Sequence, residues 1–446
     1  MTTKKAVLIS LALVLMVVIA GLAILYDPGT NEKRIELDGD QDLLNMAEES
    51  GWPGSGTTDD PIIIEGLDLN VSGGEPCFSL SNAHLHLLIR NCQITNPSPN
   101  TDDQGVGMLL SDVTNVTVQG CVIRGGEVGL KVLSSKYVVI EGSAVHGGVH
   151  GLLMTGSSSS IFSNTMITGA LNASYCDHNQ LSNVSFDGMG ANDLSNCDSN
   201  EFAGTTFNAT EGPGLRLIDS DDNHFDRCTF RGKPLGAGGS RGMIGLVLTH
   251  AHGSRVTNCS MAGGGYMGIG ASLIDSSSNE IDDCHLLGRT AFYLNGADDN
   301  IISENLLEGS VVGIDMHDCS GCSIINNSLD SELSVTGLQM IGGGSNRISD
   351  NILSTHSVSG FAIYLNGSSS NTILGNSFVY LGEGARSMAL GVDDTVGNAW
   401  NDSIGGNHWG DLTTPDDDDD GIIDTPYYLE GGSGAADYRP LAILPS

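Results

Sequence analysis

An acidic run near the C-terminus carries the clearest chemical pattern in the chain. Five consecutive aspartates, Asp416 to Asp420, are followed by Gly421-Ile-Ile-Asp424. Alternate carboxylates followed by glycine at the sixth place are typical of a calcium-binding loop, in which glycine allows a sharp turn and the seventh residue gives its carbonyl oxygen. The twelfth place is Tyr427 rather than a bidentate Glu, so we expect modest affinity. The predicted Ca²⁺ ligands are Asp416, Asp418, Asp420, the carbonyl of Ile422, and Asp424.

The alternative for this run is a disordered acidic segment. The residues that follow it, Thr425-Pro-Tyr-Tyr-Leu429, have the composition of packed structure rather than of a disordered tail. This favours calcium.

A second motif, His317-x-Cys319-x-x-Cys322, has the residue types that hold zinc or copper. No second Cys-x-x-Cys pair follows it to complete four ligands. A Cu or Zn site at His317, Cys319 and Cys322 is therefore the weaker hypothesis. A local disulfide, or two thiols in a turn, is the favoured interpretation.

Three of the other cysteines fall in register with a repeat. Cys228, Cys259 and Cys284 each lie five residues after a repeat start, and the same place is then filled by Asn305 and by Asn327. We predict a buried stacking position that is occupied first by sulfur and then by amides, which bond to one another and to turn backbone.

The repeat itself decides the fold. A polar start followed by an apolar residue two places on recurs about every 24 residues, which leaves room for two or three strands and for no ordinary helix. Each unit can bury its apolar face only by stacking on its neighbours. We predict an all-β fold, a right-handed parallel β-helix of about 13 coils, in preference to a propeller or a leucine-rich repeat. The repeat starts are His86, Asn115, Tyr137, Ser160, Asn179, Asn200, Asn223, Ser254, Asn279, Asn300, Cys322, Asn346, Asn371 and Asn398.

Composition limits the classes of partner. The chain has 446 residues, 54 acidic against 18 basic, and a formal net charge of −36, which argues against nucleic acid and anionic membrane surfaces as ligands. Aromatic residues make up only 5% of the chain, so small aliphatic side chains must fill the core.

The N-terminus predicts a membrane anchor. Ala6 to Tyr26 is apolar apart from Ser10, follows Lys4 and Lys5, and is long enough to span a bilayer. An uncleaved transmembrane helix with the lysines inside is favoured over a cleaved signal peptide, which would give a secreted protein.

Four segments follow from these patterns. Residues 1–26 form the cytoplasmic tip and anchor, 27–60 a juxtamembrane linker and N-terminal cap, 61–406 the β-helix, and 407–446 a C-terminal cap with the acidic loop. In the N-terminal cap we predict a short helix from Asp40, as N-cap, to Glu49, with Leu43, Leu44 and Ala47 on one face. Such a helix would cover the exposed sheet edge at the first coil.

Three stretches resemble a known family. They are Gly51-Trp-Pro-Gly-Ser-Gly to Glu65-Gly66, then His86-Leu-Leu-Ile-Arg-Asn-Cys92, and a closing part with Gly406-Asn-His-Trp-Gly-Asp411, Thr425-Pro-Tyr427 and Arg439-Pro-Leu441. They are similar to the archaeal and bacterial right-handed β-helix proteins related to the copper-maturation factor of nitrous-oxide reductase (NosD type). The resemblance covers about residues 51 to 446. It implies the fold, and it leaves copper delivery, surface roles and carbohydrate-active enzymes open as functions.

Taken together, the sequence favours a membrane-anchored extracellular surface protein without enzymatic activity. It would bind glycans or neighbouring cell-envelope proteins and have a calcium-stabilised C-terminal end. The first alternative is a polysaccharide lyase or glycoside hydrolase, to which Asp221-Asp222 and His252-Gly253 give faint support. The second alternative is a NosD-like factor that delivers copper to an envelope enzyme.

Overall fold

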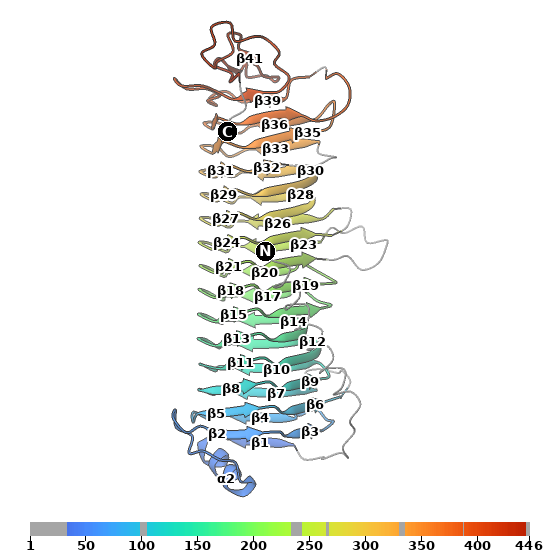
Figure 1. Cartoon of the computed structure of the whole chain (residues 1–446), viewed down its shortest axis with the longest axis vertical. Coiled ribbons are helices and arrows are strands. Elements are labelled where there is room, and N and C mark those ends of the chain that lie inside the picture. The colour runs from blue at the N-terminus through green and yellow to red at the C-terminus, as the bar shows by residue number, and fades with distance from the viewer. Residues whose placement is uncertain are drawn as a thin grey trace, which may run out of the picture.

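The chain forms a rod of stacked coils, and the computed structural model describes residues 34–98, 105–232, 243–264, 267–329, 335–386 and 388–442. Figure 1 shows α2 (Asp40–Ser50) at one end of the rod and β41 (Tyr427–Tyr428) at the other. The predicted anchor at residues 6–26 lies outside the described residues. Among the residues that are described, no helix is long and apolar enough to cross a membrane.

Each coil has three short strands, which build three faces of a parallel β-helix of about 13 coils, as the repeat predicted. Face 1 contains β1 (Ile35–Asp38), β4 (Phe78–Ser81), β7 (Val106–Ser111), β10 (Val128–Leu133), β17 (Asn192–Ser195), β20 (Leu215–Ile218), β23 (Ile244–Thr249), β26 (Ile269–Ile274), β33 (Thr336–Ile341), β36 (Phe361–Asn366) and β39 (Gly391–Asp393).

Face 2 is a sheet of 14 strands. It contains β2 (Ile62–Glu65), β5 (Leu87–Arg90), β8 (Val116–Gln119), β11 (Val139–Glu141), β13 (Ile161–Ser163), β15 (Gln180–Ser182), β18 (Glu201–Ala203), β21 (His224–Asp226), β24 (Arg255–Thr257), β27 (Glu280–Asp282), β29 (Ile301–Ser303), β31 (Ser323–Ile325), β34 (Arg347–Ser349) and β37 (Thr372–Leu374).

Face 3 follows face 2 in every coil. It contains β3 (Asp68–Asn70), β6 (Gln93–Asn96), β9 (Val122–Gly125), β16 (Ser185–Gly188), β19 (Thr206–Ala209), β22 (Thr229–Gly232), β25 (Ser260–Gly263), β32 (Ser328–Leu329), β35 (Ile352–Thr355), β38 (Ser377–Tyr380) and β40 (His408–Trp409). Four long strands run from face 3 into face 1 and join the two faces into one sheet of 26 strands: β12 (Ala144–Thr155), β14 (Met166–Ser174), β28 (His285–Asn295) and β30 (Leu306–His317).

Successive side chains along these strands point alternately into the interior and toward the surface, and apolar side chains fill the interior. In face 3, Phe186, Phe207 and Phe230 stack on one another with ring centroids 5.4 Å apart. Face 2 adds Phe202 and Phe225, whose centroids lie 4.7 Å apart. Stacked rings at this separation contribute beyond the apolar area that they bury, so few aromatic residues suffice for the core.

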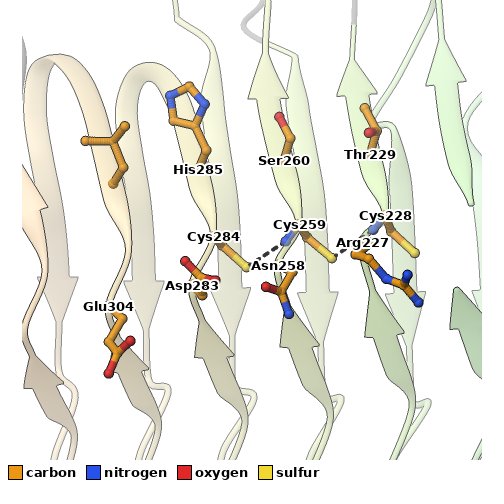
Figure 2. A pocket seen from close by; sticks show the side chains of 11 residues that line it. Arg227, Cys228, Thr229, Asn258, Cys259, Ser260, Asp283, Cys284, His285 and Glu304 are labelled. Atoms are coloured by element: carbon orange, nitrogen blue, oxygen red, sulfur yellow. Dashed lines mark hydrogen bonds between the residues drawn. The ribbon is translucent and has the colours of Figure 1, made fainter. Parts of the chain in front are cut away.

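A ladder of polar side chains at the corner between faces 2 and 3 joins successive coils. Cys228 N donates to Cys259 Sγ at 3.2 Å, and Cys259 N donates to Cys284 Sγ at 3.3 Å. Figure 2 shows these three cysteines stacked at the same place in neighbouring coils. Cys284 N then donates to Asn305 Oδ1, and amides continue the ladder through Asn327, Asn351, Asn376 and Asn407. The predicted change from sulfur to amide at one stacking position is therefore confirmed.

A second ladder runs just before the strands of face 2. Its asparagines accept the backbone N–H of the preceding coil, as Asn200 Oδ1 does from Asn179 N at 2.9 Å. Each ladder ends on a fully buried carboxylate that also accepts a tryptophan N–H. These are Asp393, with Asn398 and Trp400, and Asp437, with Asn407 and Trp409. A carboxylate suits the last rung because it needs only to accept hydrogen bonds.

The N-terminal cap forms as predicted in outline, with two corrections. Helix α2 buries Leu43 and Ala47 and ends at Gly51 in the left-handed conformation, but Leu44 is 37% exposed. The helix begins after Gly39, so the prediction of Asp40 as N-cap is wrong. Its carboxylate instead accepts the backbone N–H of His84 at 2.6 Å and of Leu85 at 3.1 Å, and thereby holds the helix on the first coil.

Strand β1 was not expected from the sequence. Because β1 pairs with β4 rather than with the strand that follows it, the residues before the helix already belong to face 1. At the other end β40 still pairs with β38, so the coils extend to Trp409, three residues into the segment predicted as the C-terminal cap. Beyond it, β41 and β42 (Ala436–Asp437) form an antiparallel pair, and Tyr427 stacks on Trp409 at 3.9 Å.

Replacing Asn327 by Ala is expected to destabilise the rod by about 3 kcal/mol, because several buried hydrogen-bonding groups lose their partner. The Asn327 side chain accepts from Asn305 N at 3.1 Å and donates to Ile302 O at 2.8 Å. The measurement is urea unfolding followed by circular dichroism. Ile301→Thr is the control, since this neighbouring side chain is 45% exposed. Equal midpoints for the two variants would contradict a stabilising ladder.

Candidate functional site

The acidic loop lies beyond β40 and is held in place by the C-terminal segment. Ile423 N donates to Pro440 O at 2.7 Å, and Ala442 N donates to Gly421 O at 3.0 Å. Between these bonds, Ile422 pairs with Leu441 in an antiparallel bridge. The loop is thus an ordered part of the cap, and the alternative of an unstructured acidic tail is wrong.

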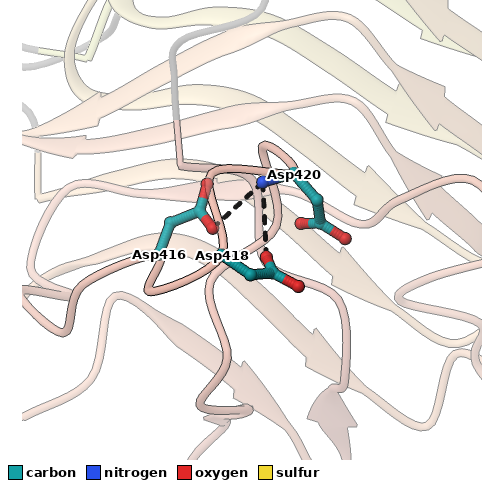
Figure 3. A group of neighbouring side chains, drawn as sticks. All are labelled: Asp416, Asp418 and Asp420. Atoms are coloured by element: carbon teal, nitrogen blue, oxygen red, sulfur yellow. Dashed lines mark hydrogen bonds between the residues drawn. The ribbon is translucent and has the colours of Figure 1, made fainter.

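Three of the predicted calcium ligands come together in this loop. Carboxylate oxygens of Asp416, Asp418 and Asp420 lie within 4.8 Å of one another. Asp416 and Asp418 both turn toward the amide nitrogen of Asp420, which lies 3.3 Å from an oxygen of each (Figure 3). Gly421, at φ 87°, makes the turn in a conformation that a larger residue rarely adopts, and its N–H donates to Asp416 Oδ2 at 2.8 Å.

Of the other two predicted ligands, Asp424 makes a different contact, and the backbone of Ile422 is fixed on both sides. Asp424 is not part of the three-carboxylate group, and its Oδ2 accepts Asp417 N at 2.9 Å. Ile422 is fixed by its bridge to Leu441 and by the bond from its N–H to Asp420 Oδ1 at 2.8 Å. The Asp420 amide lowers the pKa of Asp418, but the charges of Asp420, Asp424 and Asp416 outweigh it, and the pKa is raised overall. A cation at the loop would relieve this repulsion.

The soft-metal motif is not assembled. Cys319 Sγ donates to His317 O at 3.1 Å, whereas Cys322 Sγ donates to Ala297 O at 3.1 Å. Burial raises the pKa of Cys319 to about 11 and that of Cys322 to about 12, so both thiols stay protonated. His317 points outward from face 1 and pairs with Asp315. The Cu or Zn hypothesis at His317, Cys319 and Cys322 therefore has no geometric support, and neither cysteine is in a disulfide.

The pair Asp221 and Asp222, considered above for glycoside hydrolysis, has a structural role. Asp221 Oδ1 accepts His252 N at 2.7 Å across two coils, and Asp222 occupies a left-handed corner position at φ 54°. The Asp221 carboxylate thus holds a turn of the next coil, as Asp198 and Asp298 do elsewhere along the rod.

Face 1 carries a surface cluster that the sequence analysis did not single out. We call it the face patch: Tyr293, Asn295, Asp315, His317, Gln339, Tyr364 and Asn366. Its members lie on the outward rows of β28, β30, β33 and β36, where strand register sets Tyr293 beside Asp315, Asp315 beside Gln339, and Gln339 beside Tyr364.

Contacts within the face patch hold its polar groups in place. Asp315 Oδ1 lies 3.0 Å from His317 Nε2 and accepts from Gln339 Nε2 at 3.2 Å. The rings of Tyr293 and His317 are 5.6 Å apart. The Asp315 and His317 side chains are 18% and 30% exposed, so they are reachable yet restrained. Burial, and then the Asp315 carboxylate, raise the pKa of Tyr293, which keeps its hydroxyl protonated.

A shallow depression lies at the corner between faces 2 and 3, beside the cysteine ladder (Figure 2). It has a volume of about 350 Å³, and its rim carries Arg227, Asp283, His285 and Glu304. His285 Nε2 pairs with Glu308 at 3.0 Å. The cysteines beneath are buried, so this surface offers mixed charge and no accessible thiol.

With this geometry in hand, comparison with known families gives two matches. Residues 235–414 match the family model described as periplasmic copper-binding protein (NosD). Residues 64–192 match the right-handed β-helix region. The resemblance inferred from the sequence, to NosD-like right-handed β-helix repeat proteins, is confirmed. None of the curated proteins matched the sequence.

Comparison with solved structures gives matches of low sequence identity. The Dettilon tailspike protein (gp208) is 12% identical with a TM-score of 0.36, and the match covers 81% of this chain and 66% of that one. The siphovirus 9NA tailspike receptor-binding domain is 11% identical with a TM-score of 0.41, covering 84% and 79%. The alginate lyase AlyF-OU02, in complex with G6, is 8% identical with a TM-score of 0.41, covering 94% and 95%.

For copper, which the NosD description names, the described residues offer no group of three His or Cys side chains close enough to hold a metal. Copper favours thiolate, thioether and imidazole ligands. In the described ranges, the one group of three His, Cys, Asp or Glu side chains close enough to hold a metal is Asp416, Asp418 and Asp420, which offers only carboxylate oxygen. Oxygen donors suit calcium instead.

Proposed function

Taking a NosD-like right-handed β-helix as the premise, we propose that this protein is a membrane-anchored extracellular surface protein that binds glycan chains. The face patch is its binding surface, and calcium stabilises its C-terminal end. The observation that carries the proposal is the row Tyr293, Asp315, Gln339 and Tyr364 on one flat face. The expected anchor at residues 6–26 would place this face outside the cell.

The chemistry of the face patch suits a sugar. The apolar side of a sugar ring packs on an aromatic ring, while carboxylates and amides accept and donate hydrogen bonds to its hydroxyl groups. Tyr293 and Tyr364 supply rings three coils apart, a distance of roughly 14 Å at the usual strand spacing. Asp315, Gln339 and Asn366 supply the polar groups between and beside them. A net charge of −36 leaves nucleic acid out of consideration.

A polysaccharide lyase or hydrolase is the second candidate, because His317 pairs with Asp315 beside Tyr293 and so offers a base next to two hydrogen-bonding groups. Two features of the face patch favour binding over cleavage. Asp315 is its sole carboxylate, whereas hydrolysis of glycosides generally uses two. The patch also contains no Arg or Lys to neutralise the carboxylate of a uronate, which a lyase needs.

Replacing Tyr293 by Ala is expected to weaken glycan binding at least about tenfold, equivalent to about 1.4 kcal/mol. The measurement is binding of the full-length protein to a glycan array, followed by titration with the best oligosaccharide. Tyr175→Ala is the matched control, because this tyrosine is 64% exposed and lies outside the face patch. A glycan that binds wild type and Tyr293→Ala equally would contradict the assignment of the surface. An array without any binding would leave an envelope protein as the partner of this face.

Calcium is expected to raise the unfolding temperature of the full-length protein, since a ligand that binds only the folded state stabilises it. The increase should disappear when Asp416 and Asp418 are both replaced by Asn, which preserves size while removing charge. Differential scanning calorimetry with calcium and with chelator measures the effect. Asp221→Asn, in a corner far from the loop, should keep the full response. A calcium response that survives in the double variant would place the cation elsewhere.

A further inference from the structure

A second hollow on the rod differs from the rest of this acidic protein. We call it the bend groove. It has a volume of about 390 Å³ at the corner between faces 2 and 3, near the N-terminal end. The residues that line it, all within the described part of the chain, include no Asp or Glu. Its principal residues are Val122, Ala144 and Met166, which are apolar, with Arg124 and His146 beside them.

We propose that the bend groove binds a small organic acid, with its anionic group on Arg124 and the apolar face of its ring on Val122, Ala144 and Met166. This site is separate from the face patch and goes beyond the proposed function.

Strand register places the cationic side of the groove. Arg124 on β9 lies between Thr95 on β6 and His146 on β12, all on the outward side of face 3. Among the described residues, no carboxylate pairs with Arg124. The first acid along this row is Asp187, two strands beyond His146. Arg124 is partly exposed. A guanidinium without a carboxylate partner attracts an anion, and its planar fork suits carboxylate geometry.

His146 adds a hydrogen-bonding group rather than a second charge. Its Nδ1 lies 3.1 Å from Thr168 Oγ1, which orients the ring. Burial, and then the neighbouring Arg124, lower its pKa, so the imidazole is neutral at pH 7. The anion is therefore held by one positive charge. This fits a ligand with a single acidic group better than a polyanion, which the surrounding negative charge would repel.

The hollow exists because two corner residues lack side chains. At the same corner of the neighbouring coils, Asn91 and Asn164 have φ of 53° and 49°. Gly120 and Gly142 have nearly the same backbone, with φ of 61° and 56°, so glycine is not required there by conformation. A Cβ added at Gly142 would meet nothing within 4 Å. Both glycines line the groove together with Met166, which is 47% exposed.

The groove therefore has the components of a small-molecule site. Its volume lies in the range of ligand pockets, its floor is apolar, and a few polar groups converge on one side. Asn91, Gln93 and Asn164 at the rim can bond to hydroxyl groups of a sugar acid. An aromatic acid would use Arg124 and the apolar floor alone.

The test titrates the full-length protein with methyl β-D-glucuronide, methyl β-D-glucoside, benzoate and inorganic sulfate by isothermal calorimetry or ligand-observed NMR. We expect the glucuronide or benzoate to bind at least tenfold more tightly than the neutral glucoside. Whichever of the two binds more tightly shows whether the natural ligand is a sugar acid or an aromatic acid. If sulfate binds as tightly as both acids, the apolar floor has no role in binding. If neither acid binds, the proposed site is wrong.

Two variants separate the site from general charge effects. Arg124→Gln should weaken binding of the acid at least tenfold by removing the positive charge. Gly142→Asn should weaken it similarly by filling the hollow, with a residue that the neighbouring corners already accept. Gly156→Asn is the matched control, since Gly156 has φ 60° at the opposite corner, where an added Cβ comes no closer than 3.8 Å to another residue. Wild-type affinity in both Arg124→Gln and Gly142→Asn would contradict the proposal. Tyr293→Ala should leave acid binding intact, so failure here and failure of the face patch are distinguishable.

Discussion

The structure depends on one repeated hydrogen bond, in which a backbone N–H at the corner of one coil donates to a side chain from the next. Amide side chains do this best, because an asparagine accepts that bond and also donates to a neighbouring carbonyl, as Asn327 does. Strand hydrogen bonds alone would tolerate a shift of register along a flat sheet. Two ladders of side chains on either side of face 2 fix the register of each coil on its neighbour. The buried Asp393 and Asp437 then end the ladders where no further coil follows.

Fixed register is what turns an ordinary sheet into a possible binding surface. The residues of the face patch come from four coils. Only the pairs Tyr293/Asn295, Asp315/His317 and Tyr364/Asn366 are close in sequence. A slip of one residue in any coil would send the outward side chain of that strand into the core. The same stacking brings Gly120 and Gly142 into adjacent corners, where the missing side chains produce the bend groove. Both surfaces are therefore consequences of the ladders, and neither requires a loop to move.

Much of the fold follows from local pattern in the sequence. The repeat starts place the strands of face 2, and the exchange of Cys284 for Asn305 at one position reveals the ladder. The helix after Gly39 is visible as well, because its apolar residues have helical spacing. Strand β1 was missed because its partner, β4, lies beyond an intervening helix and two strands. Leu44 was misplaced because an 11-residue helix that rests on one coil buries only a narrow stripe.

The two sites differ in how far they could be predicted from the sequence. The acidic loop is local, so spacing alone found Asp416, Asp418 and Asp420, although it could not show that Asp424 bonds to Asp417 instead. The face patch combines residues that are distant in sequence. Relating Tyr293 to Tyr364 requires counting the outward positions in each coil, and the coils differ in length. Applying the repeat register to the residues three places before each left-handed corner would have aligned Tyr293, Asp315 and Tyr364 in advance.

Hydrogen exchange with mass spectrometry tests whether the ladders hold the face patch as a rigid glycan-binding surface. The full-length protein is compared with and without a bound oligosaccharide. We expect slow exchange at the ladder corners in both states, with added protection confined to peptides covering β28, β30, β33 and β36. Rapid exchange at those corners, or ligand protection on another face, would contradict it.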